Sequence, residues 1–490
     1  MSVANLILSL EELSAKTLDV IIIGSGPAGV AVAERLYEQH PDATIGVLER
    51  GTILTLTHIN NIFSNEKRRT LIDRFKSNLW DGTFQEGGML ITALGGRGTV
   101  SGALLRRFDE IDFTLWKNGQ WPASVVADLP HYYNAAELQR RVSVGTLRGP
   151  AQTWAIGTLH EFQAYPPPLG IDLWPGGGFE VGKGYDSSAS RLWKLLLDDS
   201  LTGKQNRIHV ATNAYVTRIV HNGSEVTGLW CLNTLNESKS ECFLLKARQF
   251  VLAASPIESS RLVLHSQLGS DNPAVGRYLA EHLERRAKII VPAPTRNIQS
   301  QGISVLIPPA GTKNNLRFQI HLRGEPDYDG NLIIDIAGFA AMDPSSENCV
   351  TLSLTRDVYD VPRAHTHVLL TDGDKERAGN LCHRIQEIGK MLNGKFITER
   401  YPYEGIEPKY VDHAKTIQLM DPGRSYHEAG TLRMGIDAST SVTDEFGKFR
   451  GVANFYAADA SVSPCVGVAN PMLTITALGY RLADYIHKFL

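Results

Sequence analysis

Residues 19–29 read DVIIIGSGPAG, and they carry the strongest indication of how this chain folds. Its apolar, β-branched run from Val20 to Ile23 predicts a short strand that is buried on both faces. The run leads directly into Gly24, Gly26 and Gly29, which have the spacing of a G-x-G-x-x-G motif. A buried strand that turns through such glycines into a helix predicts a site for the phosphates of a dinucleotide.

The residues that follow supply the context that this motif requires. Residues 30–40, VAVAERLYEQH, favour a helix, and residues 43–50, ATIGVLER, predict a second buried strand that contains Glu49. In such a β-α-β unit Gly24 allows a sharp turn, Gly26 lets a pyrophosphate approach the backbone, and the third glycine lets the helix pack on the strand. Glu49 would accept hydrogen bonds from the adenosine ribose. The motif alone does not distinguish FAD from NAD, and a tight turn without a ligand is the alternative.

The composition is that of an ordinary globular protein. A chain of 490 residues favours two domains. With 43% hydrophobic and 21% charged residues and a net charge of -3, it offers no basic field for nucleic acid. We find no apolar run that would span a membrane and no signal peptide. Its five cysteines are scattered and form no C-x-x-C pair, which indicates neither a metal site nor a disulfide framework. A cytoplasmic location is the prediction.

The pattern changes further along the chain. Residues 207–220, 225–232 and 247–255 alternate with period two and predict strands. Residues 284–424 combine apolar alternating stretches with one predicted helix at 374–393. We therefore expect an α/β fold, in which a Rossmann-like domain with a parallel sheet is joined to an α+β domain built on an antiparallel sheet. Residues 470–490 predict a closing helix.

The segment from Leu94 to Trp116, LGGRGTVSGALLRRFDEIDFTLW, is glycine-rich at first and then helix-like. Taken by itself, it could wrap a cofactor or form a surface loop.

The C-terminal block, SYHEAGTLRMG at 425–435 and residues 441–486, resembles the glucose–methanol–choline (GMC) oxidoreductase family, FAD enzymes that oxidise alcohols. VIIIGSGPAG, the pair Gly95-Gly96 and FVLAASPIESSRLVLHS at 250–266 also resemble segments of that family. The resemblance lies mainly in the FAD domain and is weakest over 284–424. It implies an FAD-binding domain made of 1–150, 183–283 and 425–490, a connecting segment at 151–182, and a substrate-binding domain at 284–424.

The resemblance also implies roles for individual residues. His427, before Gly-Thr, is the expected base, and Asn470 is its expected partner. The cofactor-binding residues that it implies are Gly24, Gly26, Ala28, Gly29, Glu49, Arg50, Gly95, Gly96, Ser101, Val216, Ala254, Asp459, Ala460, Pro471 and Met472. Pro471 would lie in the first turn of the closing helix, whose positive end could stabilise reduced flavin.

These residues suit the removal of a hydride from an alcohol carbon. A hydride leaves easily only if the hydroxyl proton also leaves, so the site needs a base, and histidine titrates near neutral pH. Asn470 can hold the hydroxyl and aim the C–H bond at flavin N5. The alternatives are that His427 is a buried structural histidine and that Asn470 is a helix N-cap. The other histidines, including His282, His365 and His367, are assigned to structural or surface positions without a metal.

The chain departs from the family pattern in its loop. Where the family usually has Gly-Gly-Ser-Ser, this chain has Gly95-Gly96-Arg97-Gly98. Members that bind flavin covalently place a histidine at the position of Val100, so we expect non-covalent FAD. Ser255 stands where the family commonly has glycine.

The leading prediction is an FAD-dependent oxidation of a primary or secondary alcohol. HEAGTLRMG and SPIESSRLVL favour the branch that acts on sugars and polyols, with an aminosugar as the narrower hypothesis, and the electron acceptor is oxygen or another molecule. The alternatives are a cyanohydrin-type lyase of the same fold, and a nicotinamide enzyme or a non-catalytic flavin-binding module. The lack of a second G-x-G-x-x-G and of a closely spaced cysteine pair argues against nicotinamide enzymes and disulfide reductases.

Overall fold

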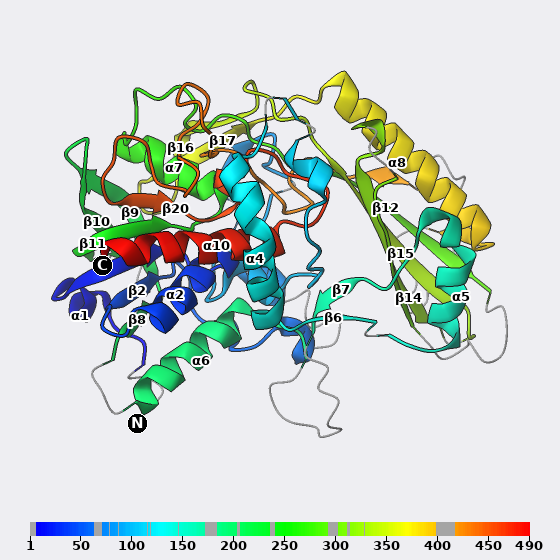
Figure 1. Ribbon diagram of the computed structural model, residues 1–490, viewed down its shortest axis with the longest axis horizontal. Helices are drawn as coiled ribbons and strands as arrows, with labels where there is room; N and C mark the ends of the chain where they lie inside the picture. Colours follow the sequence, from blue (N-terminus) through cyan, green and yellow to red (C-terminus); the bar gives the residue numbers. More distant parts are fainter. Residues whose placement is uncertain are drawn as a thin grey trace.

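A computed structural model shows two large sheets, each with its own helices, on either side of the molecule (Figure 1). The structure describes residues 6–62, 71–77, 79–86, 88–114, 116–117, 119–145, 147–171, 184–202, 206–235, 241–292, 302–310, 314–327, 329–397 and 417–490. The predicted fold class, a Rossmann-like parallel sheet joined to an antiparallel one, is confirmed.

The first sheet has seven strands in the order β8-β2-β1-β11-β10-β9, with β20 added beside β11. The strands are β1 (Thr17–Ile23), β2 (Ile45–Leu48), β8 (Ile208–Ala211), β9 (Ala214–His221), β10 (Val226–Asn233), β11 (Cys242–Leu252) and β20 (Phe455–Ala457). Five of them, β8, β2, β1, β11 and β20, run parallel. The long strand β11 changes partner along its length, since its first residues pair antiparallel with β10 and the rest pair parallel with β1.

Strand β1 is buried on both faces, as its apolar run predicts. Val20 and Ile22 belong to one hydrophobic cluster, and Ile21 and Ile23 belong to another on the opposite face. The first cluster also contains α2 (Pro27–Gln39) and α6 (Ser188–Leu201), which pack against each other. Helix α10 (Met472–Ile486) lies beside α2 and α4 (Ala123–Gln139) (Figure 1). A glycine in α10, Gly479, permits this approach, because a Cβ there would lie 3.1 Å from the Ala28 carbonyl oxygen.

The second sheet is antiparallel and has six strands. Its order is β13-β14-β15-β12-β18, with β19 paired to β12. The strands are β12 (His282–Val291), β13 (Ile303–Ile307), β14 (Phe318–Pro326), β15 (Leu332–Ala341), β18 (Lys395–Ile397) and β19 (Gln418–Leu419). Helix α8 (Asp372–Met391) covers one face through Leu381, Ile385 and Ile388 (Figure 1). The helix predicted at 374–393 is therefore present, and the opposite face of the sheet is left for the cavity described below.

One stretch inside the predicted substrate domain lies elsewhere. Residues of NCVTLSL form β16 (Cys349–Arg356), which pairs with β17 (Pro362–His367) and through it with β4 (Trp80–Gly82) in a separate three-stranded sheet. This sheet packs on α7 (Pro256–Ser266), which also packs on β9 of the first sheet. The hairpin thus adjoins the dinucleotide side of the molecule, and alternation alone does not reveal which sheet a strand will join.

The remaining described elements are short. They are α1 (Leu10–Ser14), η2 (Ile59–Asn61), β3 (Lys76–Ser77), β5 (Leu90–Ile91), η3 (Gly96–Thr99), η4 (Glu110–Phe113), β6 (Val142–Val144), α5 (Pro150–Thr158), η5 (His160–Phe162), β7 (Pro168–Gly170), η8 (Asn314–Leu316), η9 (Ala460–Val462) and η10 (His487–Phe489). The helix-like interpretation of the segment from Leu94 to Trp116 is wrong, because its described residues form only the short 3₁₀ helices η3 and η4. Within the described residues, no helix combines the length and the apolar character that crossing a membrane requires.

Candidate active site

A cavity of about 950 Å³ lies between the two sheets, at the large end of the range for ligand pockets. Of the seventeen residues that the sequence assigned to the site, fifteen line it, and the other two, Gly29 and Gly95, contact the lining residues Gly24 and Ser25. The lining comes from all three segments of the predicted FAD-binding domain and from β12, β14 and β15 of the second sheet. Residues from both ends of the chain therefore meet in one space.

The glycine turn has the geometry that its motif predicts. Gly24 has a φ of +109°, and a Cβ there would lie 2.3 Å from the Ala253 carbonyl oxygen. At Gly29 a Cβ would lie 2.1 Å from the Gly24 carbonyl oxygen, so α2 packs directly on the turn. A Cβ at Gly26 would meet no protein atom within 4 Å, so the room beside Gly26 opens into the cavity. Gly26 is also the N-cap of α2 and provides no side chain to bond the first N–H groups.

Glu49 lies at the end of β2, beside the turn. Its carboxylate accepts hydrogen bonds from the Ser25 hydroxyl at 2.5 Å and from the Gly51 N–H at 2.9 Å. The Gly95 N–H in turn donates to the Ser25 hydroxyl at 2.9 Å, so this hydroxyl links the glycine-rich loop to Glu49. Burial raises the pKa of Glu49 to about 7.

Arg50 is held among acidic groups at the cavity wall. Its guanidinium lies 3.9 Å from the centre of the Tyr215 ring and forms ion pairs with Glu258 at 3.8 Å and Asp357 at 3.4 Å. Asp357 lies in the loop between β16 and β17, so Arg50 joins that hairpin to the dinucleotide domain. Val216 follows Tyr215 on β9 and lines the same part of the cavity.

The loop that departs from the family pattern binds the C-terminal block through Arg97. Its guanidinium donates to the Tyr426 carbonyl at 2.8 Å, to the Glu428 carboxylate at 2.6 Å and to the Ser255 hydroxyl at 3.1 Å. Tyr426 and Ser255 both have positive φ, +61° and +82°. Such backbone conformations persist only where surrounding contacts hold them. Arg97 thus compensates for a serine at a position where glycine is favoured.

Asp459, in the C-terminal block, also binds the strained residue Ser255. Its carboxylate accepts from the Ser255 N–H at 3.0 Å, the Ser259 hydroxyl at 2.5 Å and the Ser461 N–H at 2.8 Å. Burial raises the pKa of Asp459. Ala460 begins η9, and Ala254 precedes the strained Ser255.

His427 and Asn470 lie together on the cavity wall, 43 residues apart in the chain. The Asn470 amide nitrogen is 3.0 Å from Nε2 of His427. On the other side of the ring, Nδ1 of His427 is 2.9 Å from Nδ1 of His282. The Phe339 ring packs against His427 with a centroid separation of 5.4 Å. His282, which the sequence analysis assigned to a structural or surface position, therefore contacts the predicted base.

Asn470 does not cap the closing helix. Pro471 is the N-cap of α10 and no side chain caps it, because the Asn470 side chain instead bonds His427 and accepts from the Gln319 amide at 2.8 Å. The capping alternative is therefore wrong, whereas Pro471 opens the closing helix as expected, since its carbonyl accepts from the Ile475 N–H at 2.9 Å. The N-terminal end of α10 nevertheless faces the cavity through Pro471 and Met472.

The electrostatic setting of His427 favours its neutral form. Burial and the nearby groups of His282 and Arg97 hold the pKa of His427 well below its ordinary value of 6.5. Burial likewise lowers the pKa of His282 to about 4. Behind His427, Glu281 accepts from the Gly423 N–H at 2.5 Å and from the His427 N–H at 3.4 Å. Its pKa is raised by burial and by the neighbouring charge of Glu428.

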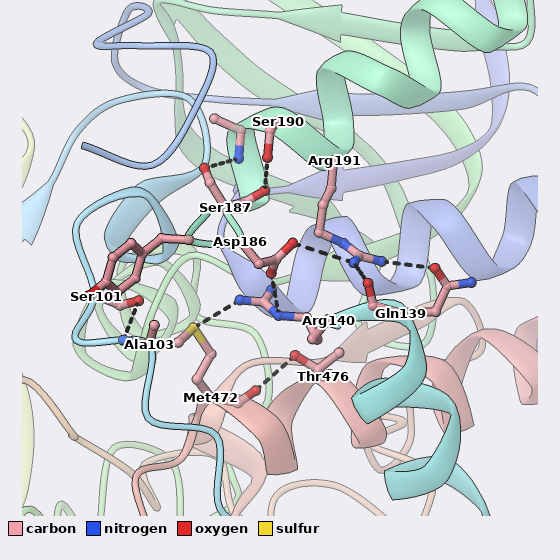
Figure 2. A network of polar contacts seen from close by, with 12 residues as sticks. Ser101, Ala103, Gln139, Arg140, Asp186, Ser187, Ser190, Arg191, Met472 and Thr476 are labelled. Carbon is pink, nitrogen blue, oxygen red and sulfur yellow. Dashed lines mark hydrogen bonds and ion pairs between the residues drawn. The ribbon is translucent and has the colours of Figure 1, made fainter. Parts of the chain in front are cut away.

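Met472 is held by a network of polar contacts with Arg140 and Asp186 (Figure 2). The Arg140 guanidinium lies 3.3 Å from the Met472 sulfur and 2.8 Å from the Asp186 carboxylate. Asp186 is also 3.7 Å from Arg191. Ser101 is held nearby, where its hydroxyl accepts from the Ala103 N–H at 3.3 Å (Figure 2). Arg140 follows α4, Asp186 precedes α6 and Met472 begins α10, so these contacts connect the ends of the three helices.

The second sheet supplies a polar wall. Three cross-strand rows on β12, β15 and β14 run away from His427. The rows are Glu284, Phe339 and Gln319, then Arg286, Ala337 and His321, then Lys288, Asp335 and Arg323. Charged and hydrogen-bonding side chains facing a cavity suit a polar ligand rather than an apolar one.

The residues present fit an FAD. Gly26 leaves room where a pyrophosphate would approach the backbone, α2 offers uncapped N–H groups there, and Glu49 stands at the end of β2. Among the residues that the structure describes, no three His, Cys, Asp or Glu side chains gather as metal ligands.

Sequence reasoning missed three residues at the site, namely Arg97, His282 and Gln319. Arg97 was visible only as a departure from the family's loop. A signal for His282 existed in VGRYLAEHL, the segment at 275–283 that resembles the family's entry into the substrate domain. For Gln319, on a strand without any motif, the sequence gives no signal.

Comparisons with known proteins agree with this arrangement. Residues 344–479 match the profile of a family described as GMC oxidoreductase. Paromamine 6'-oxidase of Streptomyces fradiae is 26% identical over 96% of this chain and 91% of its own length. Pyranose 2-oxidase of Tricholoma matsutake is 23% identical over 59% of this chain and 55% of its own length. The crystal structure of formate oxidase of Aspergillus oryzae, reported in connection with FAD modification, superposes with a TM-score of 0.69 at 15% identity, over 97% of this chain and 98% of that one.

Proposed function

This chain belongs to the GMC oxidoreductase family of FAD-dependent alcohol and sugar oxidoreductases, and we propose that it oxidises a hydroxyl of a sugar, aminosugar or polyol to the carbonyl. The observation that carries the proposal is the meeting of His427 and Asn470, whose Nε2 and Nδ2 atoms lie 3.0 Å apart at the cavity wall. Paromamine and a pyranose, named for the two relatives, support a polyhydroxylated substrate. The polar wall of the second sheet supports the same class.

His427 acts as the general base. Its lowered pKa keeps the ring neutral, so Nε2 has a lone pair that can accept the proton of a substrate hydroxyl. The Asn470 amide donates to the same hydroxyl oxygen and fixes the direction of the adjacent C–H bond. When FAD is bound, it supplies the acceptor for the hydride that leaves this carbon. The electrons then pass to oxygen or another acceptor.

The FAD is held without a covalent bond. Val100 lines the cavity at the loop position where the family resemblance places the histidine of covalent members, and a valine side chain cannot form that bond. Gly24, Gly26 and Glu49 would hold the adenosine diphosphate part, and the N-terminus of α10, which lines the same cavity, would supply partial positive charge to the reduced ring. Acid precipitation of the purified protein should leave a colourless pellet and a yellow supernatant. A pellet that stays yellow after washing contradicts non-covalent binding.

An anaerobic substrate screen tests the proposal. Purified holoprotein is mixed under nitrogen with sugars, aminosugars, polyols and simple alcohols, the loss of flavin absorbance is followed, and air is then admitted. Bleaching by a polyhydroxylated alcohol supports the proposed reaction, and its reversal in air identifies oxygen as an acceptor. A cyanohydrin-type lyase would leave the spectrum oxidised while it cleaved its substrate. Protein that cannot be loaded with flavin, or flavin that no alcohol reduces, contradicts the proposal.

A further inference from the structure

Five hydrogen bonds form one continuous line through the site. Nη1 of Arg106 lies 3.4 Å from Oε1 of Gln319, and Nε2 of Gln319 lies 2.8 Å from Oδ1 of Asn470. Nδ2 of Asn470 is 3.0 Å from Nε2 of His427, and Nδ1 of His427 is 2.9 Å from Nδ1 of His282. The line ends where Nε2 of His282 lies 3.0 Å from a backbone carbonyl oxygen, that of residue 467.

The groups at the two ends of this line fix which atom donates and which accepts in every hydrogen bond between them. A guanidinium only donates, so the oxygen of Gln319 must face Arg106, and its NH₂ group must point to Asn470. The NH₂ of Gln319 requires an acceptor, which fixes Oδ1 of Asn470 toward it and turns the Asn470 NH₂ to His427. The donor at Arg106 therefore requires that Nε2 of His427 is an acceptor and carries no hydrogen.

The other end leads to the same result independently. A carbonyl oxygen only accepts, so the hydrogen of neutral His282 is on Nε2, and its Nδ1 has a lone pair. Nδ1 of His427 must then donate to it, which again leaves Nε2 of His427 without hydrogen. Two amides and two imidazoles, each of which has two possible orientations or tautomers, are thereby fixed in one state.

We propose that Arg106, Gln319 and His282 are positioning residues for the oxidation, which present the basic Nε2 of His427 and the donating Nδ2 of Asn470 to one substrate hydroxyl. The inference rests on the proposed function and adds three residues to it, of which only His282 lies in a segment that resembles the family. Gln319 and His282 are almost fully buried, so water does not satisfy their bonds in place of the protein. In this structure the Nε2 lone pair accepts from Asn470, so a substrate hydroxyl has to displace that bond: its proton then points to Nε2 of His427, and the Asn470 NH₂ donates to its oxygen.

Gln319→Glu is the most direct test, because it keeps the shape and reverses one polarity. A carboxylate beside Arg106 stays ionised and only accepts, so Asn470 must rotate and turn its oxygen toward His427. We expect FAD content to be retained and flavin reduction to slow by about 10²-fold, as for other misplaced site groups. Gln319→Glu that reduces within threefold of the wild-type rate, with bound FAD, would overturn the role of Gln319.

His282 is tested by its tautomer effect, which needs no substrate. In wild-type holoprotein labelled with ¹⁵N-histidine, the His427 signals, assigned by their absence in His427→Ala, should show hydrogen on Nδ1 and none on Nε2. His282→Leu removes the acceptor and should give a mixture of tautomers, whereas His282→Gln, whose amide oxygen can accept, should restore the wild-type pattern. His209→Gln, which replaces a buried histidine on β8 away from the cavity, is the matched control.

The outcomes separate this proposal from the proposed function. Hydrogen on Nε2 of His427 in the wild type, or an unchanged tautomer in both His282→Leu and Gln319→Glu, overturns the positioning role. If His282→Leu does not fold, Gln319→Glu and the wild-type spectrum still decide. A wild-type spectrum with hydrogen on Nδ1, in a holoprotein that no alcohol reduces, retains the tautomer assignment and rejects the alcohol oxidation.

Discussion

The imidazole of His427 is bonded at both nitrogens, to His282 through Nδ1 and to Asn470 through Nε2. Because the ring is partly accessible from the cavity, its removal should leave the fold intact and change mainly the function. We expect His427→Ala to retain FAD and to slow flavin reduction by about 10²–10⁴-fold, the usual worth of a positioned acid–base group. Single-turnover reduction under nitrogen measures the rate. A rate equal to that of the wild type removes His427 from the reaction.

The pH dependence of that rate follows from the surroundings of His427. Its pKa lies well below 6.5, so the neutral base is present above that lowered value and is lost only when the pH falls through it. Flavin reduction should therefore stay on its plateau through pH 6.5 and decline only in clearly more acidic solution. Stopped-flow reduction at saturating substrate across the acidic range measures the profile. A half-maximal rate near pH 6.5 would show that His427 titrates as an ordinary exposed histidine.

The presence of His427 and Asn470 at one cavity could be predicted because a continuous motif surrounds each of them. Their supports could not, because His282, Gln319 and Arg97 lie 145, 108 and 330 residues away from His427 in the chain. Contacts of that separation depend on how two sheets face each other, and neither propensity nor periodicity reports this. The sequence also led us to expect Asn470 as a possible cap, since asparagine favours that position, but the amide finds better partners across the cavity.

In the strand–turn–helix unit of β1 and α2, one glycine, Gly24, is needed for folding and another, Gly26, for binding. Gly24 and Gly26 are two residues apart, yet a Cβ at Gly24 would lie 2.3 Å from a backbone oxygen at a φ of +109°, whereas one at Gly26 would meet nothing within 4 Å. Gly24→Ala should therefore destabilise the fold. Gly26→Ala should fold normally and weaken FAD binding, because its Cβ enters the space that a pyrophosphate would use.

The two variants are controls for each other. Thermal unfolding of the apoproteins and fluorescence titration with FAD measure the two effects separately. Full FAD affinity in Gly26→Ala would mean that the cofactor does not approach this turn. An apoprotein of Gly24→Ala as stable as the wild type would contradict the strain assigned to Gly24.

Elements whose pattern is local were predicted well. β1 alternates its apolar side chains between two cores, and α2 follows its turn, because both depend on neighbouring residues. The segment at 94–116 is not the helix that its pattern predicts, since contacts outside the segment place some of its charged residues. Asp112, for example, is ion-paired with Arg317, which directly precedes β14. Tertiary contacts overrode local preference there.

In the molecule as a whole, the region beside His427 contains more buried carboxylates than guanidinium groups. Glu281 and Glu428 are both buried beside His427, and Arg97 forms an ion pair with Glu428 at 2.6 Å. The start of β12 meets the C-terminal block at this point, since Glu281, which directly precedes β12, accepts from the His427 N–H. The fold therefore compensates one of two carboxylates with a cation and holds the other, Glu281, with a raised pKa.

Stability should respond to pH through Glu281. Its pKa is higher in the folded protein than in the unfolded chain, because burial and the charge of Glu428 disfavour the ionised form. The stabilisation from the neutral carboxyl is complete below the unfolded value of 4.5 and is lost as the pH rises through the folded value. Each unit of difference is worth about 1.4 kcal/mol. Wild-type protein should thus lose thermal stability from mildly acidic to mildly alkaline pH.

Glu281→Gln isolates this effect, because glutamine keeps the shape of the neutral acid and cannot ionise. The glutamine NH₂ cannot accept from one of the two backbone N–H groups that Glu281 bonds, so the FAD-loaded variant should melt somewhat below the wild type at mildly acidic pH, and the difference should shrink or reverse in alkaline solution as the wild-type carboxyl ionises. Glu428→Gln is the matched comparison: it breaks the ion pair with Arg97 and leaves that guanidinium without its buried partner, so it should destabilise the protein in neutral solution. If the wild type and Glu281→Gln follow parallel curves across the whole range, Glu281 is ionised in the folded protein, and a second compensating cation must be sought beside it.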